Sequence, residues 1–62
     1  MIKLDQFLKF LGIAPTGGQA KIMIINGDVK VNGEVETRRG RKLEASDEVT
    51  VEGKTFTVGD VL

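Results

Sequence analysis

The 62-residue sequence contains no cysteine and no histidine. Without cysteine, the chain forms neither disulfide bonds nor thiolate metal sites. Without histidine, it lacks the commonest general base and the commonest metal ligand. We therefore expect a non-catalytic protein that requires no metal and no cofactor.

Long apolar segments are also absent. The longest uninterrupted apolar run, Ile22 to Ile25, is far too short to cross a bilayer. The N-terminus lacks the apolar core of a signal peptide. These features predict a cytoplasmic protein without membrane contact. We also expect a monomer. The length allows one small domain over residues 1–62, with a marginal core and hardly room for a deep pocket.

The net charge is zero, but the two signs are unevenly distributed. Residues 1–42 carry eight basic and four acidic groups, which gives +4, whereas residues 43–62 carry one basic and five acidic groups, which gives −4. A chain polarised in this way can attract a polyanion with one end although its total charge is neutral. Accidental clustering in a short chain is the alternative.

The N-terminal segment predicts a helix from about Leu4 to Leu11, because its apolar residues recur at the spacing of a single stripe. Gly12 is a plausible end for this helix. The residue before Pro15 is disfavoured in the helical conformation, so a tight connector should follow. A second helix comes next, and the two should form a helical hairpin.

The second helix should begin after Thr16, an N-cap residue that forms a capping box with Gln19. It should end at Gly27, where a left-handed residue can close it. Its apolar residues occupy two faces, so we expect it to be packed between the first helix and a sheet. Glycines leave its start bare, and the free N–H groups there can face an anion, although ordinary capping explains the same residues.

The alternation of Val29–Val31 predicts a half-buried strand, and Asn32-Gly33 predicts a hairpin turn. A two-residue turn would pair Lys30 with Val35. A three-residue loop would pair Lys30 with Glu34, and we favour it because each face of the sheet is then unmixed.

A second hairpin is predicted with its turn at Gly53-Lys54. In that register Val51 lies opposite Phe56, and Val49 lies opposite Val58. Residues 59–62 should form a frayed tail. Together these elements predict an α+β fold, a two-helix hairpin packed on a small, mostly antiparallel sheet.

The segment 37–42 has no periodicity and carries four charges of one sign, which predicts an exposed loop. Such a loop can be a solvated surface run, or it can bind phosphate and stack on unpaired bases through its arginines. The three phenylalanines fall in apolar patterns, and we expect them in the core rather than as platforms for bases.

Several ordered motifs give the chain a resemblance to a known family. They are Leu4-Asp5-x-Phe7-Leu8, Thr16-Gly17-Gly18-Gln19-Ala20-Lys21, Ile24-x-x-Gly27-x-Val29-x-Val31-Asn32-Gly33, Arg41-Lys42-Leu43 and Asp47-x-Val49. From about Ile2 to Val51 the chain resembles the alpha-L RNA-binding motif, the domain named after small-subunit ribosomal protein S-four. It is most similar to the short, stand-alone bacterial versions, which carry no catalytic partner. The resemblance implies binding to structured RNA such as ribosomal RNA.

Two positions depart from the family pattern. Many members carry an arginine at the start of the second helix, where this chain has Gly17 and Gly18. The departure implies less side-chain charge there and more reliance on backbone N–H groups. Ser46 stands where a glycine usually precedes the aspartate, so we expect a locally different turn without an effect on binding.

Phosphate contacts need cations or exposed N–H donors spaced along a backbone. We expect the polar side of the first helix, the start of the second helix and the basic loop to converge on one continuous basic face. The predicted RNA-binding residues are Lys3, Lys9, Thr16, Gly17, Gly18, Gln19, Lys21, Lys30, Arg38, Arg39, Arg41 and Lys42.

Other function classes fit less well. The segment 12–17 mimics the opening of a phosphate loop, but Gly18-Gln19 stands where Lys-Ser/Thr is required and no strand precedes Gly12. A sulfur carrier should end in Gly-Gly, whereas this sequence ends in Asp60-Val61-Leu62. A protein–protein interaction module without a nucleic-acid role stays open as the alternative.

Replacement of Lys21 by alanine separates binding from capping. If the side chain contacts phosphate, Lys21→Ala weakens RNA binding in a fluorescence anisotropy titration and leaves the thermal unfolding midpoint nearly unchanged. A folding defect without a specific loss of binding would instead support a role in helix capping and packing alone.

Overall fold

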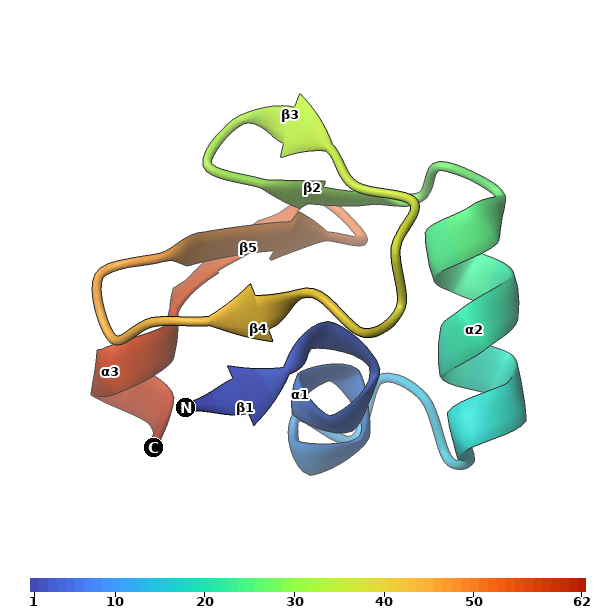
Figure 1. Ribbon diagram of the computed structural model, residues 1–62, viewed down its shortest axis with the longest axis horizontal. Coiled ribbons are helices and arrows are strands. Elements are labelled where there is room, and N and C mark those ends of the chain that lie inside the picture. The colour runs from blue at the N-terminus through green and yellow to red at the C-terminus, as the bar shows by residue number, and fades with distance from the viewer.

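Three helices and two antiparallel sheets make up the computed structural model, which describes residues 1–62 (Figure 1). The elements are β1 Ile2–Lys3, α1 Leu4–Phe10, α2 Gly17–Ile25, β2 Val29–Val31, β3 Glu34–Val35, β4 Lys42–Leu43, β5 Glu48–Val51, β6 Lys54–Thr57 and α3 Val58–Val61. One sheet has the order β3-β2-β5-β6, and the other consists of β1 and β4. The predicted α+β fold is confirmed.

Helix α1 follows its apolar stripe. Leu4, Phe7 and Leu8 are fully buried. Gly12 adopts a φ of +77°, in the left-handed region that glycine tolerates best, and the chain turns there as predicted. The stripe therefore directs α1 into the core.

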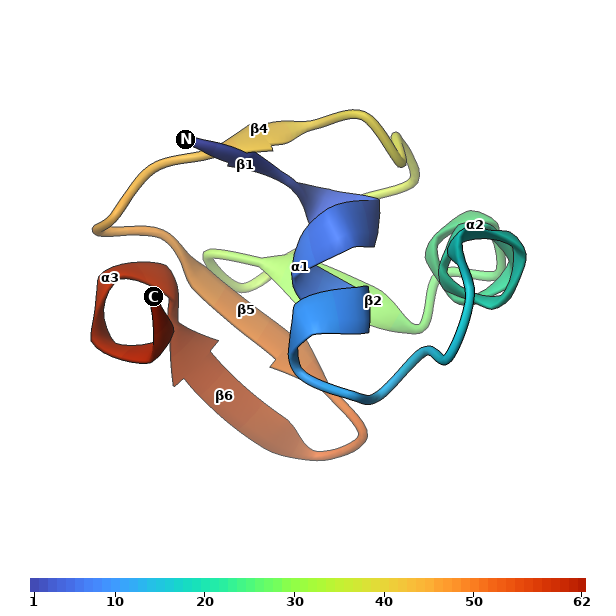
Figure 2. The same ribbon diagram turned by 90° about the horizontal axis from the view of Figure 1, so that it is seen from below.

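Helix α2 has the predicted ends but not the predicted surroundings. The Thr16 hydroxyl accepts a hydrogen bond from the Gln19 N–H at 3.1 Å, and Gly27 has a φ of +82°. The expected burial on two sides is wrong, because Ile22 and Ile25 are 54% and 55% exposed. Figures 1 and 2 explain the difference, since α2 lies at the edge of the molecule with α1 on only one side of it.

The first hairpin has a two-residue turn, so the favoured three-residue loop is wrong. Lys30 pairs with Val35 and Val31 with Glu34, with φ values of 53° at Asn32 and 84° at Gly33. Two left-handed residues make a turn whose twist matches that of the flanking strands. The pairing of polar with apolar residues on each face destabilises the sheet little, because β3 is an edge strand with both residues exposed.

The second hairpin is also shifted from its predicted register. Its turn occupies Glu52 and Gly53, with φ values of 54° and 75°, and Val49 pairs with Phe56 rather than with Val58. Glycine at the second turn position again allows the left-handed pair. Val58 is released from the sheet and becomes the first residue of α3.

Residues 58–61 form α3, so the predicted frayed tail is wrong. Val58 is fully buried, and its N–H donates to the Asp47 carbonyl at 3.0 Å. The Gly59 N–H donates to the Ala45 carbonyl at 2.8 Å. The end of the chain is therefore anchored on the turn formed by residues 44–47.

This turn is closed by Asp47 and linked to the first hairpin by Asn32. The Asp47 carboxylate accepts hydrogen bonds from the Glu44 N–H at 2.7 Å and from the Asn32 amide at 3.0 Å. These contacts lower the pKa of Asp47 below its ordinary value, and the hydrogen bond from the Glu44 N–H contributes most. The Asn32 side chain also accepts from the Glu48 N–H at 3.0 Å, so Asn32 joins two turns.

The core lies between α1, one face of α2 and the two sheets. Its buried members are Leu4, Phe7, Leu8, Ala14, Ala20, Ile24, Val29, Val31, Leu43, Val49, Val51 and Val58. The expectation that all three phenylalanines are core residues is wrong for Phe10, which is 59% exposed, whereas Phe56 is half-buried. None of the helices is of a length and apolarity that would let it span a membrane.

The anchoring of α3 predicts that Gly59→Ala destabilises the protein. An added Cβ would lie 2.9 Å from the Ala45 carbonyl oxygen and 3.0 Å from the Ala45 Cβ. Overpacking of this kind costs about 1–3 kcal/mol. We expect a lower thermal unfolding midpoint. Gly17→Ala is the matched control, because nothing lies within 4 Å of the added atom, and it should be neutral. Equal midpoints for both variants would mean that α3 is not docked in solution.

Candidate nucleic-acid interface

The basic loop is fixed to the start of α1 by backbone hydrogen bonds. The Leu4 N–H donates to the Arg41 carbonyl at 2.9 Å, and the Asp5 N–H donates to the Arg39 carbonyl at 3.1 Å. Helix starts have N–H groups without helical partners, and here the loop supplies the acceptors. Figure 1 shows the segment between β3 and β4 passing α2 and then meeting α1. The loop therefore has a defined position.

The short strands β1 and β4 were not predicted from the sequence. Their pairing places Lys3 beside Lys42, at the end of the basic loop. Lys3 and Lys42 are directly opposite each other in the β1–β4 pair. Both are exposed, and neither forms a salt bridge. Lys42 was predicted to lie in the exposed loop, and it is the first strand residue after that loop.

Glu36 organises the loop from within. Its carboxylate accepts hydrogen bonds from the Arg38 N–H at 3.1 Å, the Arg38 guanidinium at 3.1 and 3.2 Å, and the Arg41 guanidinium at 3.0 Å. The Glu36 side chain is only 9% exposed. The hydrogen bonds from Arg38 and then Arg41 lower the pKa of Glu36 from 4.5 to about 2. Glu36 thus stays ionised and holds two arginines near each other.

Asp5 has the same role for the third arginine. The Arg39 guanidinium lies 3.4 Å from the Asp5 carboxylate, which also accepts from the Gln6 N–H at 2.8 Å. The guanidinium groups nevertheless remain available to a ligand, because the side chains of Arg38 and Arg39 are 76% and 53% exposed. Each guanidinium has five N–H donors, and the carboxylates use only some of them.

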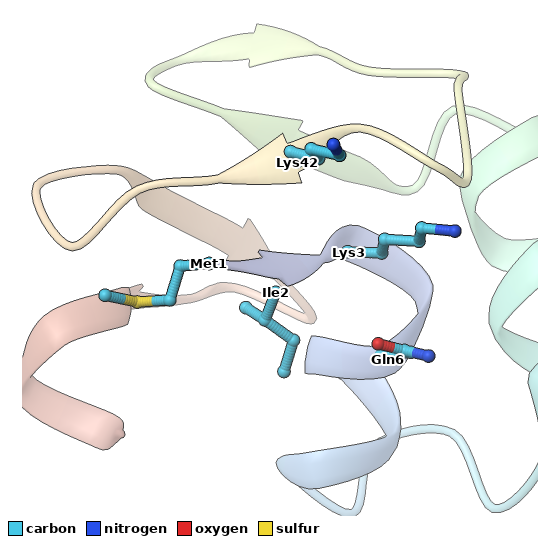
Figure 3. A pocket seen from close by; sticks show the side chains of 5 residues that line it. All are labelled: Met1, Ile2, Lys3, Gln6 and Lys42. Atoms are coloured by element: carbon cyan, nitrogen blue, oxygen red, sulfur yellow. The ribbon is translucent and has the colours of Figure 1, made fainter.

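Two adjoining hollows lie on this surface. One has a volume of about 570 Å³ and is lined by Arg38, Gly40, Arg41 and Lys42, with no apolar side chain. The other has a volume of about 290 Å³ and is lined by Met1, Ile2, Lys3, Gln6 and Lys42 (Figure 3). Lys42 lines both hollows. We call the surface formed by Lys3, Arg38, Arg39, Arg41 and Lys42 the basic junction.

The remaining predicted site residues lie elsewhere. Lys9 is in the last turn of α1, and the Thr16–Lys21 segment forms the start of α2 after the connector. Lys30 projects from β2 and is exposed. No hydrogen bond or ion pair joins these residues to the basic junction. The single continuous basic face therefore stays a prediction.

Sequence reasoning missed the two carboxylates and Gln6. Asp5 and Glu36 are the buried acidic residues of the chain, at 9% and 7% exposure. An acid two residues before an arginine pair is a signal that could have indicated Glu36. Nothing in the sequence indicated that Asp5 or Gln6 would adjoin a loop more than thirty residues away.

Comparisons with known proteins identify the family and related sequences. A family model described as the S4 domain matches residues 1–59. The Bacillus subtilis protein named "Probable ribosome maturation protein RlbA" is 47% identical over 53 residues, which cover 86% of this chain and 75% of that protein. The Escherichia coli protein named "Putative RNA-binding protein YbcJ" is 42% identical over 57 residues, which cover 92% of this chain and 81% of that protein.

The role of Glu36 predicts a pH-dependent stability. Its pKa is lower in the folded state, so its stabilising effect is complete above about pH 4.5 and is lost as the pH falls toward about 2. Glu36→Gln should lower the free energy of unfolding by about 1–3 kcal/mol at neutral pH. The difference between the two proteins should shrink across that pH range in thermal melts, because all other acids are shared. A difference that is independent of pH would contradict this account of Glu36.

Proposed function

The chain belongs to the S4 domain family, and from this premise we propose that it is a non-catalytic RNA-binding protein. We propose that its target is structured RNA, with ribosomal RNA as the first candidate, read through shape and phosphate contacts. The names of the relatives support this choice, since one is named as a ribosome maturation protein and another as an RNA-binding protein. The protein would act as a monomer in the cytoplasm.

The observation that carries the proposal is the pairing of Lys3 with Lys42. Like charges directly opposite each other in an antiparallel pair are destabilising. No carboxylate forms an ion pair with either lysine. A phosphate group placed between the two ammonium groups would remove this repulsion. A pair that is unfavourable in the free protein is thus suited to a bound polyanion.

The arginines extend this anion site. The basic junction has five cations against the two carboxylates of Asp5 and Glu36, a local excess of three positive charges. The carboxylates hold the guanidinium groups in position, and Arg38 and Arg41 line the hollow of about 570 Å³. Guanidinium groups bind phosphate in a bidentate manner. Because these guanidinium groups are held in position before binding, they favour an RNA backbone of fixed geometry.

The start of α2 would provide a second point of contact. The backbone N–H groups of Gly17 and Gly18 are free of helical partners, and Lys21 lies one turn further along. Lys9 is close in sequence to this connection, and Lys30 lies on the sheet. Two separated points of contact would suit a folded RNA better than a short linear segment.

Removal of the opposed lysines tests the proposal. The variant Lys3→Ala/Lys42→Ala should bind a fluorescently labelled ribosomal RNA hairpin more weakly, and the slope of log affinity against log salt should fall by about 1–2. The same variant should be more stable in thermal melts by roughly 0.2–1 kcal/mol, because the repulsion is gone. Lys54→Ala removes an exposed lysine from β6 and should change neither the affinity nor the slope.

Two outcomes would count against RNA binding. One is an unchanged salt slope in the double variant. The other is the absence of binding by the wild-type protein, at low salt, to both the hairpin and total ribosomal RNA. The second outcome would favour the protein–protein interaction module.

A further inference from the structure

The hollow of about 290 Å³ has a composition unlike that of its neighbour. Figure 3 shows the polar ends of Lys42, Lys3 and Gln6 on one side, while the side chains of Met1 and Ile2 extend toward the other. The neighbouring hollow at the arginines has no apolar side chain at all. A hollow lined by basic residues without apolar side chains is sufficient for phosphate groups. The hollow of about 290 Å³ also offers an apolar surface beside cations.

We propose that this hollow holds one unpaired base of the bound RNA, beside a phosphate held by Lys42. The proposal rests on the proposed function, since it specifies which part of an RNA occupies which hollow. Lys42 lines both hollows, so a single nucleotide can place its base in one and its phosphate at the edge of the other. The smaller volume suits one base rather than a larger ligand, because sites for drug-sized molecules run from about 300 to 1,000 Å³.

The chemistry of the lining residues matches a base. Met1 is 69% exposed and provides most of the apolar surface that is accessible to a flat ring, whereas Ile2 packs partly against the core. A thioether in contact with an aromatic ring is favourable. Sequence-specific recognition of RNA targets unpaired bases, whose edges are free and whose faces can stack.

Gln6 would read the edge of that base. Its side chain is exposed and makes no hydrogen bond within the protein, because only its backbone N–H is engaged, with Asp5. An amide carries both a donor and an acceptor. A glutamine amide matches adenine, which presents a donor beside an acceptor. An unpaired adenosine is therefore one base that this hollow can hold.

Two RNA hairpins that differ only in one base test this inference. Both carry a single-nucleotide bulge in the same stem, and the bulged residue is adenosine in one and an abasic nucleotide in the other. Their charge, length and backbone are the same. The wild-type protein should bind the adenosine bulge about fivefold more tightly or better, which corresponds to the net contribution of about one hydrogen bond from Gln6 to the edge of the base. The NMR methyl signals of Met1 and Ile2 should shift with the adenosine bulge and much less with the abasic one.

Gln6→Ala should abolish most of this preference and leave the salt slope unchanged, because it removes no charge. Asn26→Ala is the matched control, since it removes an exposed amide at the end of α2, and it should keep the preference. Equal affinity of the wild-type protein for the two hairpins, or a Gln6→Ala variant that keeps the preference, would overturn the base site. Salt-dependent binding of both hairpins would then still support the proposed function, whereas a loss of all RNA binding would remove both.

Discussion

The ion pairs of Glu36 are the constraint on which the arrangement of the basic junction depends. Three arginines in one short loop would repel one another and sample many conformations without a shared partner. The buried carboxylate provides that partner, because it accepts from Arg38 and Arg41 at the same time. Asp5 then attaches Arg39 to the first turn of α1. The cost of ordering the guanidinium groups is thus met during folding, and less ordering remains when an anion binds.

The same surface shows how stability and binding oppose each other. The carboxylates stabilise the loop but cancel part of its charge, whereas the opposed lysines keep their full charge and destabilise the strand pair. The chain combines the two kinds of cation on one surface. The arginines are neutralised in part and held in position by carboxylates, whereas the two lysines have no ion-pair partner and keep an uncompensated positive field.

The sequence predicted the local features of the fold and failed where distant segments meet. The stripe in α1, the Thr16 cap and the left-handed glycines depend on neighbours within a few residues, so their patterns are legible. The two-residue strands β1 and β4 are too short for periodicity to reveal, and only tertiary pairing explains them. Both hairpin registers were wrong because exposed edge strands tolerate mixed faces, which removes the pattern on which the prediction relied.

The candidate site follows the same division. The basic residues of the loop and of the α2 start could be named from composition and from the family motifs. The ion pairs that position the loop could not, because Asp5 lies more than thirty residues from Arg39 and the motif that contains it indicates no partner. The exposure of Ile22, Ile25 and Phe10 was missed because an apolar residue is assumed to be buried, whereas a domain this small cannot cover every apolar side chain.

Asn32 has a consequence for the way the molecule opens. Through its side chain and its backbone N–H, it makes three hydrogen bonds to Asp47 and Glu48, so the tip of one hairpin is held by the turn that anchors α3. Loosening either turn breaks hydrogen bonds that it shares with the other. We therefore expect the two turns to open together, so that amide hydrogen exchange at both proceeds through a shared opening event rather than through independent fraying.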